Sequence, residues 1–552
     1  MPADAATPFH DLDAFIALPR VSGLAISPDG TRLVTTVAEL KADRTAYATA
    51  IWEVDPSGQR VARRLTRSAK GESNPTFTPD GDVLFTSVRP DPEADEDLDD
   101  VATLALLPVA GGEARTVATR PGGFDAVVVA PRTGTVVAIS PTLPGSGDAQ
   151  DDRARRAARK ELKVNAVLHR TYPVRHWDHD LGPEEGRLVV GDLVAAATTA
   201  GTDRRIDLRD LTMAPGRALD EADIAVAPDG SFAVTTWYVP DTGGRRLVLQ
   251  RVDLVTGERC VLLDSPQREA YGPAISPDGH HVAAVTETVA TGATPPRFGL
   301  VVIDVATGQV VDLATTVTAP PESPVWTPDG TAVVVTADAR GRRPVFRINV
   351  ADGTTTRLTG DDGAYTDVVV SPDGTKVFAI RSAIDGAPMV VALDATTADQ
   401  TPTVLRNPVQ ATSVPGSLTE VETTATDGTA LRAWLCLPHD ASAEAPSPLL
   451  LWIHGGPLGS WNAWSWRWNP WMAVAEGYAV LLPDPALSTG YGDAFIDRGW
   501  GAWGAAPYTD LMALTDATVG RPEVDETRTA AMGGSFGGYM ANWVAGHTDR
   551  FD

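Results

Sequence analysis

Short apolar runs separated by tight turns dominate roughly the first four hundred residues of the chain. Runs such as residues 32–37, 232–237 and 332–336 are short and rich in β-branched side chains, which is typical of strands. Several of them follow a turn in which Ser, Thr or Ala precedes Pro-Asp-Gly. Proline presets φ and Asp-Gly supplies a corner with positive φ, so each copy predicts a tight strand-to-strand turn.

This turn repeats about every fifty residues. Copies begin at Ser27, Thr78, Ala227, Ser276, Thr327 and Ser371, and a degenerate copy begins at Ala130. The steps between them are 51, 52, 97, 49, 51 and 44 residues, and several units carry a second turn after a later strand. Four strands in a unit of this length is typical of propeller blades. Seven copies predict a seven-bladed β-propeller, against the alternative of a β-sandwich with chance turns.

The 97-residue step predicts one enlarged blade rather than an eighth blade. Its excess includes a charged, helix-forming segment at 151–163 that we expect on a blade edge. The enlarged blade also contains His169, His176 and His179 with neighbouring acids, and the pair Glu184-Glu185. A metal site or an amine-binding site is conceivable there, but nothing fixes three ligands on one face. We interpret these residues as solvated loop positions and expect neither a metal nor a cofactor.

The pattern changes after residue 405. Strands are predicted at 418–424 and 430–438, and the continuous apolar runs at 448–453 and 478–483 are typical of strands buried on both faces. Helices are expected at about 469–477 and 508–519. Such alternation predicts an α/β sheet that is at least partly parallel. We therefore divide the chain into an N-terminal segment (1–20), a propeller (21–405), a linker (406–417) and an α/β domain (418–552).

Composition narrows the possible partners. A chain of 552 residues is too long for one core. Its formal net charge of −26 argues against nucleic acid or an anionic membrane surface as a partner, since both need basic patches. Two cysteines are too few for a disulfide framework. No apolar run approaches a membrane span, and the first eight residues lack a signal-peptide pattern, so we expect a cytoplasmic protein.

Near the C-terminus, Gly533-x-Ser535-x-Gly537 matches the nucleophile elbow, in which a strand turns sharply into a helix and presents a serine. A strand is predicted at 528–532 and a helix from about 539, which is the context this motif requires. Side chains at the two flanking glycines would clash with the helix or the strand. Ser535 is therefore the candidate nucleophile.

A second motif, His454-Gly455-Gly456, follows the predicted strand at 448–453. Acyl transfer to a serine places negative charge on the carbonyl oxygen, which needs backbone N–H donors aimed at it. One donor comes from the residue after the nucleophile, Phe536, and the other from a Gly-rich loop, where Gly456 is the candidate. Both motifs, in this order, predict a serine hydrolase with an α/β-hydrolase domain.

With a propeller ahead of both motifs, the chain resembles the prolyl oligopeptidase family of serine peptidases, most of all its acylaminoacyl-peptidase and dipeptidyl-aminopeptidase branch. The matching segments are 454–457, 488–492, 533–540 and 542–551. The resemblance implies a propeller over the active site that limits access to short peptides. It assigns Ser535 as nucleophile, Phe536 and Gly456 as oxyanion donors, and His454 and Gly455 as a supporting loop. The family's usual Asn-x-Arg-Gly before Ser488 is replaced by Asp484-Pro485-Ala486-Leu487.

The triad of this fold runs in the order Ser, then Asp or Glu, then His. Both partners should follow Ser535, and the chain ends at Asp552, 17 residues later. His547 lies on or just past the helix of the elbow, so we expect a structural role for it. The triad Asp and His are thus not expected in this chain. The expectation is an α/β-hydrolase domain incomplete at its C-terminus, with negligible activity of residues 1–552 alone.

We therefore expect a serine peptidase that hydrolyses short peptides through an acyl-enzyme on Ser535. The alternatives are an esterase or amidase on the same fold, and a non-catalytic propeller scaffold. A homo-oligomer is compatible with the sequence. The preferred P1 side chain and the choice between exo- and endopeptidase are not predicted.

Overall fold

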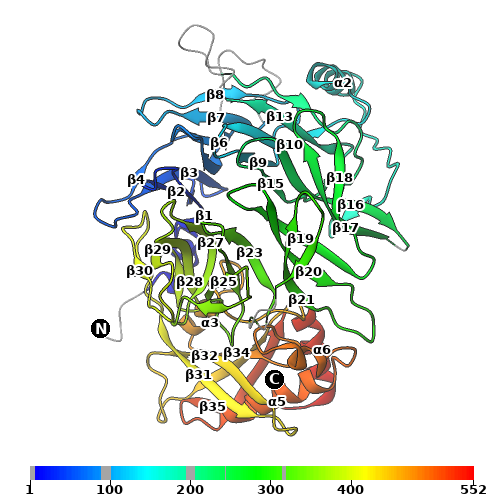
Figure 1. The fold of residues 1–552 in the computed structure, drawn as a ribbon. Helices are drawn as coiled ribbons and strands as arrows, with labels where there is room; N and C mark the ends of the chain where they lie inside the picture. The colour runs from blue at the N-terminus through cyan, green and yellow to red at the C-terminus, as the bar shows by residue number, and fades with distance from the viewer. Residues whose placement is uncertain (1–6, 89–100, 194–204, 243, 314–316, 318) are drawn as a thin grey trace.

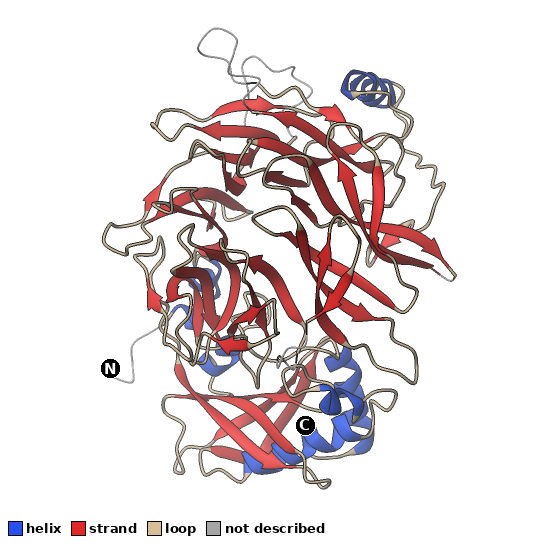
Figure 2. Cartoon of the chain, viewed as in Figure 1, coloured by secondary structure: helices blue, strands red, loops and turns tan. Residues whose placement is uncertain are grey.

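A computed structural model describes residues 7–88, 101–193, 205–242, 244–313, 317 and 319–552. The chain forms a ring of sheets, blue to yellow-green in Figure 1, and a second domain, yellow to red, packed against one part of that ring. Strands make up the ring and most helices belong to the second domain (Figure 2). The first six residues of the expected N-terminal segment lie outside the described residues.

The described part of the propeller consists of seven four-stranded antiparallel sheets. Blades one and two are β1 (Arg20–Ile26), β2 (Leu33–Leu40), β3 (Tyr47–Val54), β4 (Arg63–Arg64), and β5 (Glu72–Phe77), β6 (Val83–Ser87), β7 (Thr103–Leu107), β8 (Arg115–Ala118). Blades three and four are β9 (Ala126–Val129), β10 (Thr135–Thr142), β13 (Glu185–Asp192), β14 (Arg209–Asp210), and β15 (Ile224–Val226), β16 (Phe232–Asp241), β17 (Gly244–Asp253), β18 (Arg259–Leu263). Blades five and six are β19 (Arg268–Ile275), β20 (His281–Thr288), β21 (Phe298–Asp304), β22 (Val310–Asp312), and β23 (Pro321–Trp326), β24 (Ala332–Ala337), β25 (Val345–Asn349), β26 (Thr355–Arg357). Blade seven is β27 (Ala364–Val370), β28 (Lys376–Ala383), β29 (Gly386–Asp394) and β30 (Thr403–Val404).

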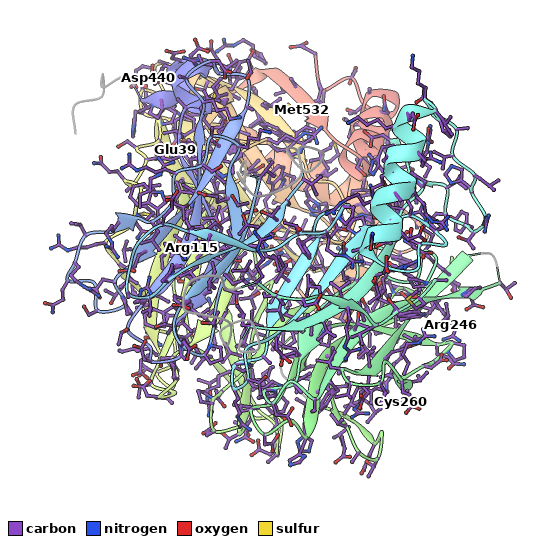
Figure 3. All side chains as sticks on the ribbon, turned by 90° about the horizontal axis from the view of Figure 1, so that it is seen from above. Glu39, Arg115, Arg246, Cys260, Asp440 and Met532 are labelled. Carbon is purple, nitrogen blue, oxygen red and sulfur yellow. The ribbon has the colours of Figure 1, made fainter. Side chains whose placement is uncertain are left out.

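The predicted seven blades are confirmed, and the 97-residue step between two turns corresponds to one enlarged blade, the third. Its insertion lies between β10 and β13 and contains α2 (Ala149–Glu161), β11 (Arg175–His176) and β12 (His179–Asp180). The helix begins and ends two residues before the predicted charged segment. Figure 3, seen from above, shows α2 in cyan at the margin of the molecule.

The Pro-Asp-Gly turns join the first and second strands of their blades. In the first copy, Asp29 Oδ1 accepts hydrogen bonds from Ser27 Oγ (2.6 Å) and Thr31 N (3.0 Å), and Gly30 has a φ of 71°. The aspartate thus satisfies donors that the turn leaves free, while glycine supplies the left-handed corner. The turn recurs along the sequence because the first and second strands of each blade are joined in the same way.

The ring closes by packing between complete blades. The first strand of blade one, β1, contacts β27 of blade seven as well as β5 of blade two. Side chains of both blades, including Val21, Leu33, Phe378 and Val390, form one buried cluster across this junction. Each blade takes its four strands from one stretch of the chain, and among the described residues none exchanges a strand with another blade. Apolar burial between blades one and seven therefore joins the two ends of the ring.

The second domain has a five-stranded sheet in the order β31-β32-β34-β33-β35. Its strands are β31 (Gly416–Thr424), β32 (Ala430–Pro438), β33 (Ser447–Ile453), β34 (Ala479–Asp484) and β35 (Val524–Gly533). Its helices are α3 (Pro470–Ala475), α4 (Asp493–Asp497), α5 (Ala506–Val519) and α6 (Phe536–His547). β33 pairs in parallel with both β34 and β35, whereas β32 is antiparallel to β34. The partly parallel sheet is confirmed, and the short α4 was not predicted.

The N-terminal segment packs against the second domain. It forms a 3₁₀ turn, η1 (Pro8–His10), and the short helix α1 (Leu12–Ile16). Phe9, which is 1% exposed, meets Trp464 edge-on at 5.9 Å between ring centroids, and Phe15 lies 6.1 Å from Trp466. Burying these rings ties the start of the chain to the domain that follows the propeller. None of the helices among the described residues is both long and apolar enough to cross a membrane.

We predict that Asp394, at the turn after β29, makes stability depend on pH. Its carboxylate accepts hydrogen bonds from the backbone and hydroxyls of Thr396 and Thr397, which lowers its pKa to about 2. The folded state therefore favours the ionised form. This stabilisation is present above the ordinary aspartate pKa of about 3.9 and is lost as the pH falls through about 2.

The expected result is a lower urea midpoint for Asp394→Asn than for the parent at neutral pH, with a difference that shrinks below about pH 4. Asp440→Asn, on the exposed turn after β32, controls for the loss of one charge. A midpoint difference that stays constant down to the acid limit of folding would contradict the assignment.

Candidate active site

The predicted elbow is a sharp strand-to-helix turn in the structure. β35 ends at Gly533, Ser535 precedes the first residue of α6, and Ser535 itself is exposed. Its backbone has φ 56° and ψ −121°, outside the regions that a non-glycine residue ordinarily adopts. Met532, labelled in Figure 3, lies on the strand that leads into this turn. A serine held in a strained conformation at an exposed apex is the geometry that a nucleophile elbow requires.

Close approach of backbone explains the glycines around Ser535. A Cβ on Gly537 would lie 2.1 Å from the carbonyl oxygen of Ile453, and a Cβ on Gly533 would lie 2.5 Å from the carbonyl carbon of Gly537. Both distances are shorter than any real contact of this kind, and the atoms met are backbone that cannot move aside. The absence of two side chains therefore lets α6 start directly against the ends of β35 and β33.

The Gly-rich loop lies against this elbow. A Cβ on Gly455 would come 3.1 Å from the carbonyl oxygen of Gly534 and 3.4 Å from Ser535 Cβ. Gly456 has a φ of 131°, which a residue with a side chain rarely adopts. Phe536 is 3% exposed and meets Trp503 edge-on, with the ring centroids 5.3 Å apart. The structure thus brings the elbow, which contains Ser535 and Phe536, against the 454–456 loop. The two motifs are far apart in the sequence.

His454 is anchored on both ring nitrogens. Its Nδ1 lies 2.7 Å from the carbonyl oxygen of Gly455, and its Nε2 lies 2.8 Å from Ser488 Oγ. Ser488 is fully buried, and its Oγ also lies 2.7 Å from the carbonyl oxygen of Pro485. A neutral imidazole that donates from Nδ1 to the Gly455 carbonyl has only an acceptor at Nε2, so Ser488 Oγ has one proton for two acceptors, Nε2 and the Pro485 carbonyl oxygen. His454 therefore supports the loop and connects it to residues 485–488.

Asp484 is the buried centre of the loops behind the oxyanion candidates. Its side chain has no solvent exposure. It accepts hydrogen bonds from Ser460 Oγ (2.9 Å), Trp461 N (3.1 Å) and Tyr491 Oη (2.6 Å). Burial, reinforced by the Asp484 carboxylate, raises the pKa of Tyr491 well above its usual range. The phenol thus stays protonated and donates, and the segment after Gly456 is tied to the end of β34.

Arg432, on β32, balances the charge of Asp484. Its side chain is 1% exposed, and Nη1 lies 3.5 Å from Asp484 Oδ2. The guanidinium stacks over Trp434, 3.9 Å from the ring centroid. Burial by itself would lower the pKa of Arg432, but the nearby Asp484, Tyr491 and Glu420 oxygens outweigh it and raise the pKa. The guanidinium therefore places a positive charge beside the buried carboxylate, which a carboxylate without solvent needs.

The segment before Ser488, where the sequence departs from the family pattern, has an unusual backbone conformation at Leu487. Leu487, where the resemblance expects glycine, has a φ of 86°. Its side chain is fully buried and packs against Gly499, where a Cβ would lie 2.5 Å from Leu487 Cγ. Ala486 N donates to the buried Asp510, which also holds Arg498 in a two-pronged ion pair. Both carboxylate oxygens of Asp510 are thus occupied by hydrogen bonds that hold this loop.

The structure places His547 at the end of α6. Its ring stacks on Trp543 with centroids 4.0 Å apart, and Nδ1 contacts the carbonyl oxygen of Trp543. In the part of the chain that the structure describes, Ser535 Oγ makes no hydrogen bond to an imidazole or a carboxylate.

The polar residues of the enlarged blade are paired locally. The interpretation of Glu185 as a solvated loop residue is wrong, because it begins β13 and is 6% exposed. Its carboxylate accepts hydrogen bonds from Arg187 and from Gly216 N, and Glu184 pairs with Arg156. Burial raises the pKa of Asp220, which lies 3.8 Å from His176 Nε2. Across the described residues, no group of three or more His, Cys, Asp or Glu side chains is arranged to hold a metal ion.

Sequence reasoning missed Arg432 and the partners of Asp484. The available signal was an arginine within an otherwise apolar predicted strand, residues 430–438. A charge at such a position implies a buried counter-charge, but the pattern does not reveal which acid supplies it.

Residues 464–552 match the model of the prolyl oligopeptidase family. The chain is 25% identical over 476 residues to a probable dipeptidyl-peptidase 5 of Aspergillus clavatus, covering 80% of this chain and 62% of the relative. It is 24% identical to an uncharacterized peptidase of Bacillus subtilis, covering 98% of this chain and 80% of the relative. The fold is similar to that of Pyrococcus horikoshii acylaminoacyl peptidase, with a TM-score of 0.72 and 14% identity over 97% of this chain and 77% of the other. The chain thus spans about three fifths of the length of the Aspergillus relative.

We predict that Gly537→Ala is strongly destabilising because its Cβ meets the carbonyl oxygen of Ile453. Forced overpacking of this kind costs about 1–3 kcal/mol or more. Gly546→Ala, on the same helix, places its Cβ in open space and should be neutral or stabilising by up to about 1 kcal/mol. Urea unfolding of both variants against the parent measures the difference. Equal midpoints for the two variants would show that the elbow is looser than described.

Proposed function

We propose, from the match of residues 464–552 to the prolyl oligopeptidase family model, that the chain belongs to that family and is part of a serine peptidase acting on short peptides through an acyl-enzyme at Ser535. The observation that carries the proposal is the exposed Ser535 at a positive-φ apex with the loop of Gly455 against it. The names of the peptidase relatives support the choice of a peptide substrate.

In the proposed reaction, Ser535 Oγ attacks the carbonyl carbon of the scissile bond and its proton passes to a general base. The N–H groups of Phe536 and Gly456 donate to the oxygen that becomes negative. The intermediate then collapses, the C–N bond breaks, and the amine leaves with the proton. Water attacks the acyl-enzyme with the help of the same base and regenerates Ser535.

The chemistry needs an acid and a base that are not identified among residues 1–552. In this fold the Asp or Glu and the His follow the nucleophile in chain order. His547 follows Ser535 in the chain, but its ring is engaged by Trp543. The proposal therefore assigns the nucleophile and the oxyanion donors to this chain and leaves the general base unassigned.

We also propose that the propeller restricts access to Ser535. Its blade-five hairpin contacts the second domain through Arg297, which pairs with Asp497 at 2.7 Å, and through Thr291 O, which accepts from Trp500 Nε1. A ring held against the second domain in this way would admit short or extended chains more readily than folded proteins.

The test is covalent labelling of the full-length gene product with a fluorophosphonate probe, followed by turnover assays. We expect labelling at Ser535 that is lost in Ser535→Ala and retained in Ser413→Ala, a control in the linker. Removing the nucleophile of such a unit costs about 10⁶ in kcat.

Peptidyl p-nitroanilides and simple p-nitrophenyl esters separate the substrate classes. Turnover of the anilides supports the peptidase. Ester turnover without anilide cleavage would replace it by an esterase, and a full-length product that never labels would favour a non-catalytic scaffold.

A further inference from the structure

The hairpin between β24 and β25 of blade six reaches into the second domain. Its Arg340 N donates to the carbonyl oxygen of Gly490 (3.2 Å), and Trp434 Nε1 donates to the carbonyl oxygen of Gly341 (3.1 Å). The approach is close, because a Cβ on Gly341 would lie 1.8 Å from Arg432 Nη1. The backbone of the propeller thus lies directly against the buried ion pair described above; β25 and β32 can be followed in Figure 1.

Asp338 opens this hairpin and faces the second domain. Its side chain is 8% exposed and accepts hydrogen bonds from three groups. Arg343 Nε, in the same hairpin, is 2.9 Å away. Asn462 Nδ2 (2.6 Å) and Thr489 Oγ1 come from the second domain, so the propeller carboxylate depends on donors far away in the chain.

Both of these donors belong to the loops that hold the oxyanion candidates. Thr489 N donates to the carbonyl oxygen of Gly459 at 3.0 Å, three residues after Gly456. Asn462 follows Trp461, whose N–H is bound by Asp484. Residues 459–462 are therefore held by one carboxylate of their own domain and, through Thr489 and Asn462, by one carboxylate of the propeller.

Because the Asp338 carboxylate is buried, separating the propeller hairpin from its hydrogen-bond donors in the second domain is costly. Leaving one of its oxygens without a donor costs more than an ordinary hydrogen bond, because the charge has already lost its water. Hydrogen bonds to a charged acceptor are also stronger than neutral ones. Separation of the hairpin from both Asn462 and Thr489 would leave Asp338 with only its local arginine.

We propose that Asp338 is a positioning residue for the loop that carries Gly456 (residues 454–462), so that the propeller orients the Gly456 N–H as well as restricting access to Ser535. The inference rests on the proposed function for its kinetic consequence. Oxyanion donors act only when aimed at the developing charge, and a displacement of about 1 Å can cost about 100-fold in rate. Loss of the Asp338 contacts should therefore lower kcat and leave substrate binding nearly unchanged.

The kinetic test uses the full-length gene product with substitutions at Thr489. Thr489→Val keeps the shape and the backbone N–H but removes the donor to Asp338, and Thr489→Ser restores a hydroxyl. We expect kcat to fall about tenfold to 100-fold in Thr489→Val, with KM within about twofold, and to recover in Thr489→Ser. Asp338→Asn should show a smaller fall in kcat, because its amide oxygen can still accept one hydrogen bond. Asp352→Asn, at the turn after β25 of the same blade, controls for a generic change in the propeller.

A second measurement does not depend on turnover. Amide hydrogen exchange should rise in residues 455–462 of Thr489→Val and Asp338→Asn, with β33 and β34 unchanged, and should stay at the parental level in Asp352→Asn. Parental exchange in this loop, or an equal rise throughout the sheet, would overturn the positioning role. If the parent shows no turnover, the proposed function fails, while exchange still decides whether the propeller holds the loop.

Discussion

Two buried carboxylates at the junction of the propeller and the second domain constrain the candidate site. Asp484 has no exposure and Asp338 only 8%. Removing a carboxylate from water costs several kcal/mol, which is offset only when donors and a counter-charge surround it. Because those donors come from β32, the 459–462 segment, Tyr491 and Thr489, these segments have to adopt one arrangement together. The loop that carries Gly456 is therefore fixed by the hydrogen bonds of the residues that follow it in the chain.

Where the 454–456 loop meets the elbow, the absence of glycine side chains determines the geometry, rather than attractive contacts. Ile453, the last residue of β33, places its carbonyl oxygen where a side chain on Gly537 would stand, and His454 begins the loop immediately afterwards. The same end of β33 thus limits both the start of α6 and the path of the oxyanion candidates. A shift of β33 would move Ser535 and the 454–456 loop relative to each other, which links the packing of the sheet to the chemistry of the site.

Local repetition made the propeller predictable from sequence, because each Pro-Asp-Gly turn uses residues within four positions of one another. The elbow was predictable for a similar reason, since Gly533 and Gly537 flank Ser535 and their requirement is steric. The network behind the site was not, because Arg432 and Asp484 are 52 residues apart and Thr489 lies 151 residues from Asp338. Periodicity in one sequence shows which face is buried but not which distant groups pair. The five-residue helix α4 is too short to produce a helical period.

The altered segment before Ser488 shows how such a network can accommodate a departure from the family pattern. The expected arginine two residues after position 484 is replaced by the buried Ala486, and the positive charge beside Asp484 comes from β32 instead. The expected glycine is Leu487, which has positive φ, a conformation that costs a non-glycine residue about 1–3 kcal/mol. Full burial of a leucine side chain contributes about 1.5–3 kcal/mol, enough to offset that strain. Packing against Gly499 and the donors around Asp484 thus hold this loop in place without a glycine at position 487.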